Sequence, residues 1–194
     1  MSNKNNITGI ILAGGKSSRM GSDKGFVIYN DKPFIQYIID ALQPLVDEII
    51  IVSNNPDYDA FKLKRVNDII ENAGPIAGLY SGLHHSNTVM NLVLSCDIPL
   101  INKDVLEQLI SQKSEEIDVI QIESQGKTMP LIALYNKRCV STCLELLESG
   151  ERRLRFLINK LKSKTIVLND TLDKHTANIN SQSDLKELNN ELEY

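Results

Sequence analysis

The chain has 194 residues, 42% of them hydrophobic, which is enough to bury one sizeable core, so we expect a single domain over residues 1–194. Its 21 Lys and Arg are outnumbered by 25 Asp and Glu, and the net charge of −4 argues against a nucleic-acid partner. The first apolar stretch, residues 7–13, is too short for a signal peptide, and no stretch reaches the roughly 20 apolar residues of a membrane helix. A cytoplasmic protein with no membrane partner is expected.

Three cysteines, Cys96, Cys139 and Cys143, show no disulfide-framework pattern, which is typical of a reducing compartment. Cys139 and Cys143 are one helical turn apart and could in principle bind a metal, but no second Cys or His pair follows. Buried thiols on a helix face are the preferred interpretation.

Short β-branched runs alternate with amphipathic segments along most of the chain, which predicts βαβ units and a mainly parallel sheet. Most predicted strands are nearly continuous in apolar residues, and the set covers residues 7–12, 48–53, 64–66, 91–95, 118–122, 131–135 and 165–168. Helices are predicted at residues 33–45, 57–63, 76–85, 103–112, 137–147, 153–162 and 183–192, with Pro33 in the first turn of its helix. Segment 131–135 follows Gln125 and Gly126 too closely for a helical crossover, so an antiparallel strand is expected there.

Four polar clusters fall where predicted strands end. In an open parallel sheet, ligands bind beyond the carboxyl ends of the strands, because loops converge there and helix N-termini point towards that edge. The clusters are LAGGKSSRMG after the first strand, Ser53-Asn54-Asn55 after the second, Asn67-Asp68 after the third and Ser95-Cys96-Asp97 after the fourth. Their coincidence with one edge predicts a single site.

The segment LAGGKSSRMGSDK, residues 12–24, is close to two phosphate-binding motifs and matches neither. A P-loop needs G-x-x-x-x-G-K-[ST], but the spacing from Gly9 to Gly15 is one residue too long and Gly9 lies within the predicted strand. The dinucleotide fingerprint G-x-G-x-x-G is absent from the segment. A different phosphate loop is left, in which Gly14 and Gly15 let the backbone approach an anion.

Two cations in this segment, Arg19 and Lys24, suit a triphosphate, since Arg binds phosphate through paired hydrogen bonds and Lys acts as a mobile point charge. The alternative is a glycine turn with solvated basic side chains. Asp97 ends an apolar strand, where a carboxylate can hold Mg²⁺ together with phosphate oxygens, or can simply form a turn. Asp68 either caps a turn or contacts a nucleotide.

The combination of LAGGKSSRMGSDK, NDIIENAGPIAG and LVLSCDIP resembles the molybdenum-cofactor guanylyltransferases, the MobA family of nucleotidyltransferases. The likeness continues through LIALYN, SGERRL and NINSQSDL, in the same order, and so covers nearly the whole chain. It implies an α/β, Rossmann-like three-layer fold with a mainly parallel sheet and an antiparallel strand. It also implies transfer of GMP from GTP to molybdopterin bearing molybdenum, with Mg²⁺ as cofactor and release of pyrophosphate.

The resemblance assigns roles residue by residue. Arg19, Lys24 and Asp97 are the implied catalytic residues, with Asp97 also the metal ligand. The implied GTP contacts are Leu12, Ala13, Gly14, Gly15, Lys24, Asn54, Asp68 and Asp97. Asn54 is one choice within Ser53-Asn54-Asn55. Gly14, in LAGG where relatives that transfer cytidylyl groups have LAAG, favours guanine. On the pterin side the implied residues are Arg152, Arg153, Asn178 and Asn180, although the two arginines could instead pair with surface acids.

An in-line attack by the terminal phosphate of molybdopterin on the α-phosphorus of GTP needs no protein nucleophile, and no nucleophilic triad is apparent in the sequence. Two alternatives stay open: a cytidylyl- or sugar-phosphate nucleotidyltransferase of the same superfamily, and a non-catalytic nucleotide-binding regulator. Proteins that insert molybdenum, and chaperones of molybdoenzymes, are further partners that the resemblance suggests.

Overall fold

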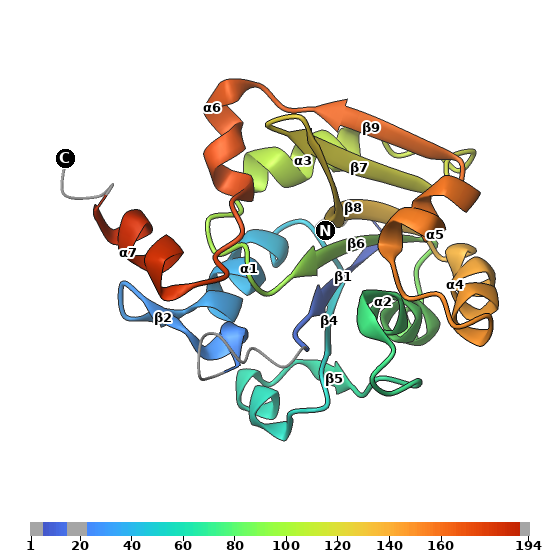
Figure 1. The fold of residues 1–194 in the computed structure, drawn as a ribbon, viewed down its shortest axis with the longest axis horizontal. Helices are drawn as coiled ribbons and strands as arrows, with labels where there is room; N and C mark the ends of the chain where they lie inside the picture. Colours follow the sequence, from blue (N-terminus) through green and yellow to red (C-terminus); the bar gives the residue numbers. More distant parts are fainter. Residues whose placement is uncertain (1–5, 15–22, 191–194) are drawn as a thin grey trace.

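The computed structural model describes residues 6–14 and 23–190 and is built around a seven-stranded sheet with the order β5-β4-β1-β6-β8-β7-β9 (Figure 1). The strands are β1 (Ile7–Leu12), β4 (Glu48–Val52), β5 (Lys64–Val66), β6 (Met90–Ser95), β7 (Val119–Ser124), β8 (Lys127–Asn136) and β9 (Ser163–Val167). Each of the seven predicted strands is therefore present, and six of the seven predicted helices are α-helices.

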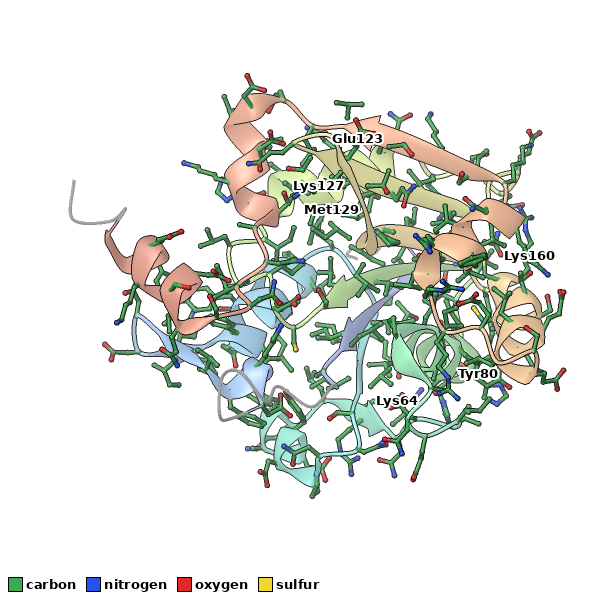
Figure 2. The ribbon with its side chains drawn as sticks, in the orientation of Figure 1. Lys64, Tyr80, Glu123, Lys127, Met129 and Lys160 are labelled. Carbon is green, nitrogen blue, oxygen red and sulfur yellow. The ribbon has the colours of Figure 1, made fainter. Side chains whose placement is uncertain are left out.

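One strand of this sheet, β8, is antiparallel to both of its neighbours, β6 and β7, while the remaining pairs are parallel. It follows β7 through a tight turn at Gln125 and Gly126, whose φ angles of 50° and 71° are those of a two-residue hairpin. Glu123, Lys127 and Met129 mark the two strands of this hairpin in Figure 2. The expected mainly parallel sheet with an antiparallel strand is confirmed.

Helices cover both faces of the sheet. They are α1 (Phe34–Leu42), α2 (Gly74–His85), α3 (Lys103–Ser111), α4 (Cys139–Glu148), α5 (Leu154–Lys160), the short α6 (Asp170–Asp173) and α7 (Gln182–Asn190). One core cluster joins α1 and α3 to one face of the strands, and a second joins α2, α4 and α5 to the other (Figure 1). Alternate residues of β1 divide between them, with Ile11 in the first and Ile10 in the second. This is the expected three-layer α/β arrangement.

The start of the first helix differs from the prediction. Pro33 is not in the first helical turn but in β3 (Lys32–Pro33), which pairs with β2 (Ile28–Tyr29) in a small antiparallel hairpin. Asn30 and Asp31 form its turn with φ angles of 44° and 60°. Pro33 has an extended backbone as the N-cap of α1, so the helix begins one residue later.

One further predicted helix and three short elements also depart from expectation. Residues 57–63 were expected to be helical, and they fold as the 3₁₀ helix η2 (Pro56–Phe61), which ends at the left-handed Lys62. The 3₁₀ turns η1 (Lys24–Phe26) and η3 (Lys174–Thr176) and the helix α6 are too short to give a periodic apolar pattern.

The C-terminal segment is attached to the hairpin rather than fully solvated. Ile179 is buried with Tyr29 and Phe34, and Leu185 of α7 packs against the same cluster. Figure 1 shows α7 beside the β2–β3 hairpin, away from the seven-stranded sheet. The sequence before α7 is therefore held close to the first part of the chain.

Cys139 and Cys143 are buried on the face of α4 that packs in the second core cluster, which confirms the interpretation as helix-face thiols. Among residues 6–14 and 23–190, no helix is long and apolar enough to cross a membrane.

Gly82 sets how closely α2 approaches the sheet. A Cβ atom on this residue would lie 2.5 Å from Cγ2 of Ile10 and 3.2 Å from Cγ2 of Val52. Both neighbours are buried strand residues with no free space to retreat into. The absence of a side chain at Gly82 therefore brings α2 against the carboxyl ends of β1 and β4.

Gly82→Ala is expected to lower the free energy of unfolding by up to about 2 kcal/mol, since overpacking costs roughly 1–3 kcal/mol and the helical preference of Ala returns about 1 kcal/mol. Denaturant unfolding measures the change. Gly78→Ala in the same helix is the matched control, because its Cβ would make an ordinary 3.5 Å contact with Leu12. Equal stability of the two variants would contradict the packing argument.

Candidate functional site

The loop after β1 begins in the middle of the sheet edge. Ala13 N–H donates to the Val52 carbonyl at 3.0 Å, and Cys96 N–H donates to the Leu12 carbonyl at 3.1 Å. Leu12 and Ala13 are buried, while Gly14 is exposed, and no atom of the described residues lies within 4 Å of the position that a Cβ atom on it would take. Residues 6–14 and 23–190 therefore leave the backbone at Gly14 open to a ligand. Gly15 and Arg19, which the sequence analysis placed in the same loop, lie outside the described residues.

Lys24 and Asp97, which the sequence analysis assigned to one site, are in contact at this edge. The Lys24 ammonium lies 3.2 Å from Oδ2 of Asp97 and donates to Oδ1 of Asn180 at 2.5 Å. Oδ1 of Asp97 accepts from the Ser95 hydroxyl at 2.6 Å, and the Asp97 side chain keeps 17% of its surface exposed. The carboxylate is therefore oriented by two neighbours and still accessible.

Asn54 and Asp68 form a second part of the site, after β4 and β5. The side-chain oxygen of Asn54 accepts from the Asp68 N–H at 2.9 Å, which distinguishes it from Ser53 and Asn55. The Asp68 carboxyl is half-buried, and this burial, followed by the nearby charge of Glu71, raises its pKa above the ordinary value. Such a shift is common where a fold holds a carboxyl group for a ligand.

The N-terminal half of α2 lies between these parts. A Cβ on Gly78 would be 3.5 Å from Leu12 Cδ2 and 3.7 Å from Asp68 Oδ1, so this glycine lies at the boundary of the two side chains. The helix begins at Gly74, and Ala73 at its N-cap provides no side-chain acceptor for the first N–H groups. The helix predicted from residue 76 thus begins two residues earlier, at Gly74.

Arg152 and Arg153 line an open depression of about 560 Å³ between the ends of α4 and α5. Its other lining residues are Leu146, Ser149, Gly150, Glu151, Phe156 and Lys160. Lys160, labelled in Figure 2, extends from α5 to Glu145. The depression is basic, with an aromatic ring on its wall.

The two arginines have different partners. Arg153 lies 2.7 Å from Oε2 of Glu151 and 4.2 Å above the Phe156 ring, and its hydrogen bonds lower the pKa of Glu151 to about 2. Pairing with a surface acid, the alternative that the sequence analysis gave for both arginines, is therefore observed for Arg153. Arg152 instead donates to the Asn72 carbonyl, directly before α2.

The four pterin-side residues divide into two groups. Asn178 and Asn180 flank Ile179, whose N–H donates to the Asp97 carbonyl at 2.8 Å. These asparagines therefore belong to the part of the site that holds Lys24, whereas the contacts of Arg152 are with the turn before α2. The link from Asn180 to Lys24 spans 156 positions, and no local sequence signal indicates it.

Within the part of the chain that the structure describes, no group of three or more His, Cys, Asp or Glu side chains is arranged to hold a metal ion. Asp97 alone fits a hard cation that takes one carboxylate and completes its shell with phosphate oxygens and water, as Mg²⁺ does. The donor set is therefore suited to a metal that arrives with a phosphate ligand.

The chain has one mainly parallel sheet between two layers of helices, with a polar site beyond the ends of its strands. This is the arrangement of the nucleotidyltransferase fold class. A crystal structure of molybdopterin-guanine dinucleotide biosynthesis protein A from Archaeoglobus fulgidus has this fold, with a TM-score of 0.81, 21% identity, and coverage of 96% of this chain and 98% of that one.

Residues 9–165 match the model of the MobA-like NTP transferase domain. A "probable molybdenum cofactor guanylyltransferase" from Flavobacterium johnsoniae is 38% identical, with coverage of 94% of this chain and 96% of that protein. The molybdenum cofactor guanylyltransferase from Vibrio vulnificus is 33% identical over 91% of each chain. The chain belongs to the MobA-like NTP transferase family.

Asp68→Asn is expected to stabilise the fold at neutral pH. A carboxyl whose pKa is raised in the folded state binds more protons there than in the unfolded chain. The charged carboxyl therefore destabilises the fold progressively as pH rises from its ordinary pKa of 3.8 to the higher folded-state pKa. The destabilisation is constant above the folded-state pKa and absent below 3.8.

The melting temperature of the Asp68→Asn variant should exceed that of the wild type at pH 7, and the difference should disappear near the acid limit of the fold. The same gain at both pH values would contradict the burial of the charge as its cause.

Proposed function

We propose that the protein transfers GMP from GTP to molybdopterin bearing molybdenum and releases pyrophosphate. The observation that carries this proposal is the meeting of Lys24, Asp97 and the open backbone of Gly14 at one sheet edge, in a chain of this family. The two relatives above are named for this activity, and the chain matches them over nearly their full lengths. Their names favour guanine over the other nucleotides used by this fold.

In this proposal the nucleoside lies over Leu12, Ala13, Asn54 and Asp68, with the triphosphate extending over Gly14 and Gly15 towards Lys24. The side chain of Asn54 accepts from the backbone N–H of Asp68 and so fixes the position of this residue. The Asp68 carboxyl is thereby held in place to accept a hydrogen bond from the nucleoside. The cost of burying that carboxyl is recovered when a donor of the nucleoside reaches it.

Asp97 is the proposed ligand of Mg²⁺, which would neutralise phosphate charge and favour the departure of pyrophosphate. The carboxylate is held by Ser95 through one oxygen, and the other oxygen is in contact with Lys24. Asp97 would hold the metal, and Lys24, which contacts the same carboxylate in the absence of ligand, would be in place to contact the phosphates.

The reaction joins a phosphate oxygen of the acceptor to the α-phosphorus of GTP and breaks the bond to the β-phosphate oxygen. Lys24 and Arg19 would stabilise the negative charge that builds on the leaving pyrophosphate. Positioning and charge are the whole contribution of the chain, since no covalent intermediate is required.

The acceptor would lie between the two pterin-side groups. Asn178 and Asn180 border it beside Asp97, and Arg152 and Arg153 provide positive charge near the start of α2. Phe156 adds an aromatic face within the same depression. Molybdenum insertion proteins and chaperones of molybdoenzymes remain proposed partners on either side of the reaction, in the cytoplasm.

Pyrophosphate release from GTP should depend on molybdopterin bearing molybdenum and on Mg²⁺, and should exceed release from CTP and UTP. Asp97→Asn is expected to lower turnover by about a hundredfold or more without loss of the fold. Asp104→Asn, an exposed carboxylate on α3, is the matched control. Equal turnover of Asp97→Asn and wild type would remove Asp97 from the metal site, and preference for CTP would favour the cytidylyl alternative.

Arg152→Ala is expected to raise the KM for the acceptor by about tenfold, since one charged hydrogen bond contributes about 1.5–3 kcal/mol, while the Kd for GTP changes little. Arg138→Ala, which removes an arginine paired with Asp118, is the control. Steady-state kinetics and calorimetry separate the two constants. A weaker Kd for GTP with an unchanged acceptor KM would move Arg152 to the nucleotide.

A further inference from the structure

Asp23, the residue before Lys24, is bonded through both of its carboxylate oxygens. Oδ1 accepts from the Gly25 N–H at 3.2 Å, which caps the 3₁₀ turn η1. Oδ2 accepts from the side-chain amide of Asn55 at 3.4 Å. This carboxylate therefore ties the turn that carries Lys24 to the segment after β4.

The strongest partner of Asp23 is a buried phenol. Tyr58 of η2 is fully buried, and its hydroxyl donates to Oδ1 of Asp23 at 2.5 Å. Its ring packs on Phe26 of η1 and on Phe61, with centroids 4.5 Å and 6.2 Å apart. Burial raises the pKa of Tyr58 well above its ordinary value, so the hydroxyl remains a donor at neutral pH.

Gly25 is shaped to this phenol. A Cβ atom on Gly25 would lie 2.2 Å from the Tyr58 hydroxyl oxygen and 2.9 Å from the ring. A side chain at this position would therefore displace the hydroxyl from Asp23. The residue directly after Lys24 thus provides the space that the Tyr58–Asp23 bond requires.

The two asparagines after β4 serve different halves of the site. Asn54 accepts from the backbone of Asp68, and Asn55 donates to Asp23. The segment that carries Tyr58 is consequently bonded on one side to the proposed nucleoside contact and on the other to the turn that bears Lys24.

We propose that Tyr58 is a positioning residue for nucleotide binding, which acts through Asp23 to fix the turn from which Lys24 reaches the phosphates. This inference rests on the proposed role of Lys24. A lysine side chain has several rotatable bonds, so a fixed backbone origin lowers the entropy lost when its ammonium binds. If the backbone of the turn moves, the Lys24 ammonium group spends part of its time out of reach of the phosphates.

The test is a double-mutant cycle that measures the Kd of Mg·GTP by calorimetry. Tyr58→Phe removes one oxygen atom and is expected to weaken binding about tenfold, because misplacement of a positioned group by about 1 Å is enough for such a loss. Lys24→Ala is expected to weaken binding more. In the Lys24→Ala background, Tyr58→Phe should change the Kd by less than about twofold, since the group that it positions is gone.

Tyr135→Phe is the matched control, since Tyr135 is also fully buried and its hydroxyl donates to the Pro130 carbonyl at 2.8 Å. Both Phe variants lose one buried hydrogen bond, so similar melting temperatures are expected. Only Tyr58→Phe should weaken the binding of Mg·GTP. If Tyr58→Phe does not fold, Asp23→Ala tests the same link from its other end, again with and without Lys24→Ala.

Equal losses from Tyr58→Phe in both backgrounds, or no loss in either, would overturn the positioning role. An unchanged Kd for Lys24→Ala alone would instead contradict the proposed phosphate contact of Lys24. Failure of the proposed transfer would be visible separately, as a wild-type protein that binds GTP and releases no pyrophosphate with the acceptor.

Discussion

Parallel strands force each crossover to return across the sheet, so the loops that follow β1, β4, β5 and β6 all emerge at one edge. The candidate residues of the nucleotide site lie in these loops or reach them. Gly82 makes the arrangement compact, because it brings α2 against β1 and β4 and places the start of that helix over the same edge. The chemistry of the site thus depends on a packing constraint near the C-terminal end of α2, where Gly82 faces the sheet.

Much of this edge can be read from the sequence, because strands buried on both faces leave continuous apolar runs and the residues that follow them must share a location. The antiparallel β8 is predictable from the short spacing after β7. The β2–β3 hairpin is not, because its strands have two residues each and its turn, Asn30-Asp31, lacks glycine. Contacts such as Lys24 to Asn180 join distant segments and leave no periodic signal.

One carboxyl group at the site is held at a cost to the fold. Asp68 is half-buried and has no ion-pair partner among residues 6–14 and 23–190, whereas Asp97 is paired with Lys24 and stays accessible. Arg153 shows the opposite case, since Glu151 and Phe156 hold it on the surface. An acceptor that binds Arg153 would therefore have to compete with Glu151, whereas a donor that reaches Asp68 would gain a carboxyl group with no ion-pair partner among the described residues.

The match to the family domain ends at residue 165, but the asparagine that touches Lys24 lies beyond it, in a segment fastened to the β2–β3 hairpin by Ile179. The shared module therefore supplies the strand ends and their loops, and a separate C-terminal segment completes one wall. That wall is bonded to both halves of the site, because Asn180 accepts from Lys24 and the Ile179 N–H donates to the Asp97 carbonyl. The end of the chain therefore joins the turn that carries Lys24 to the loop that follows β6.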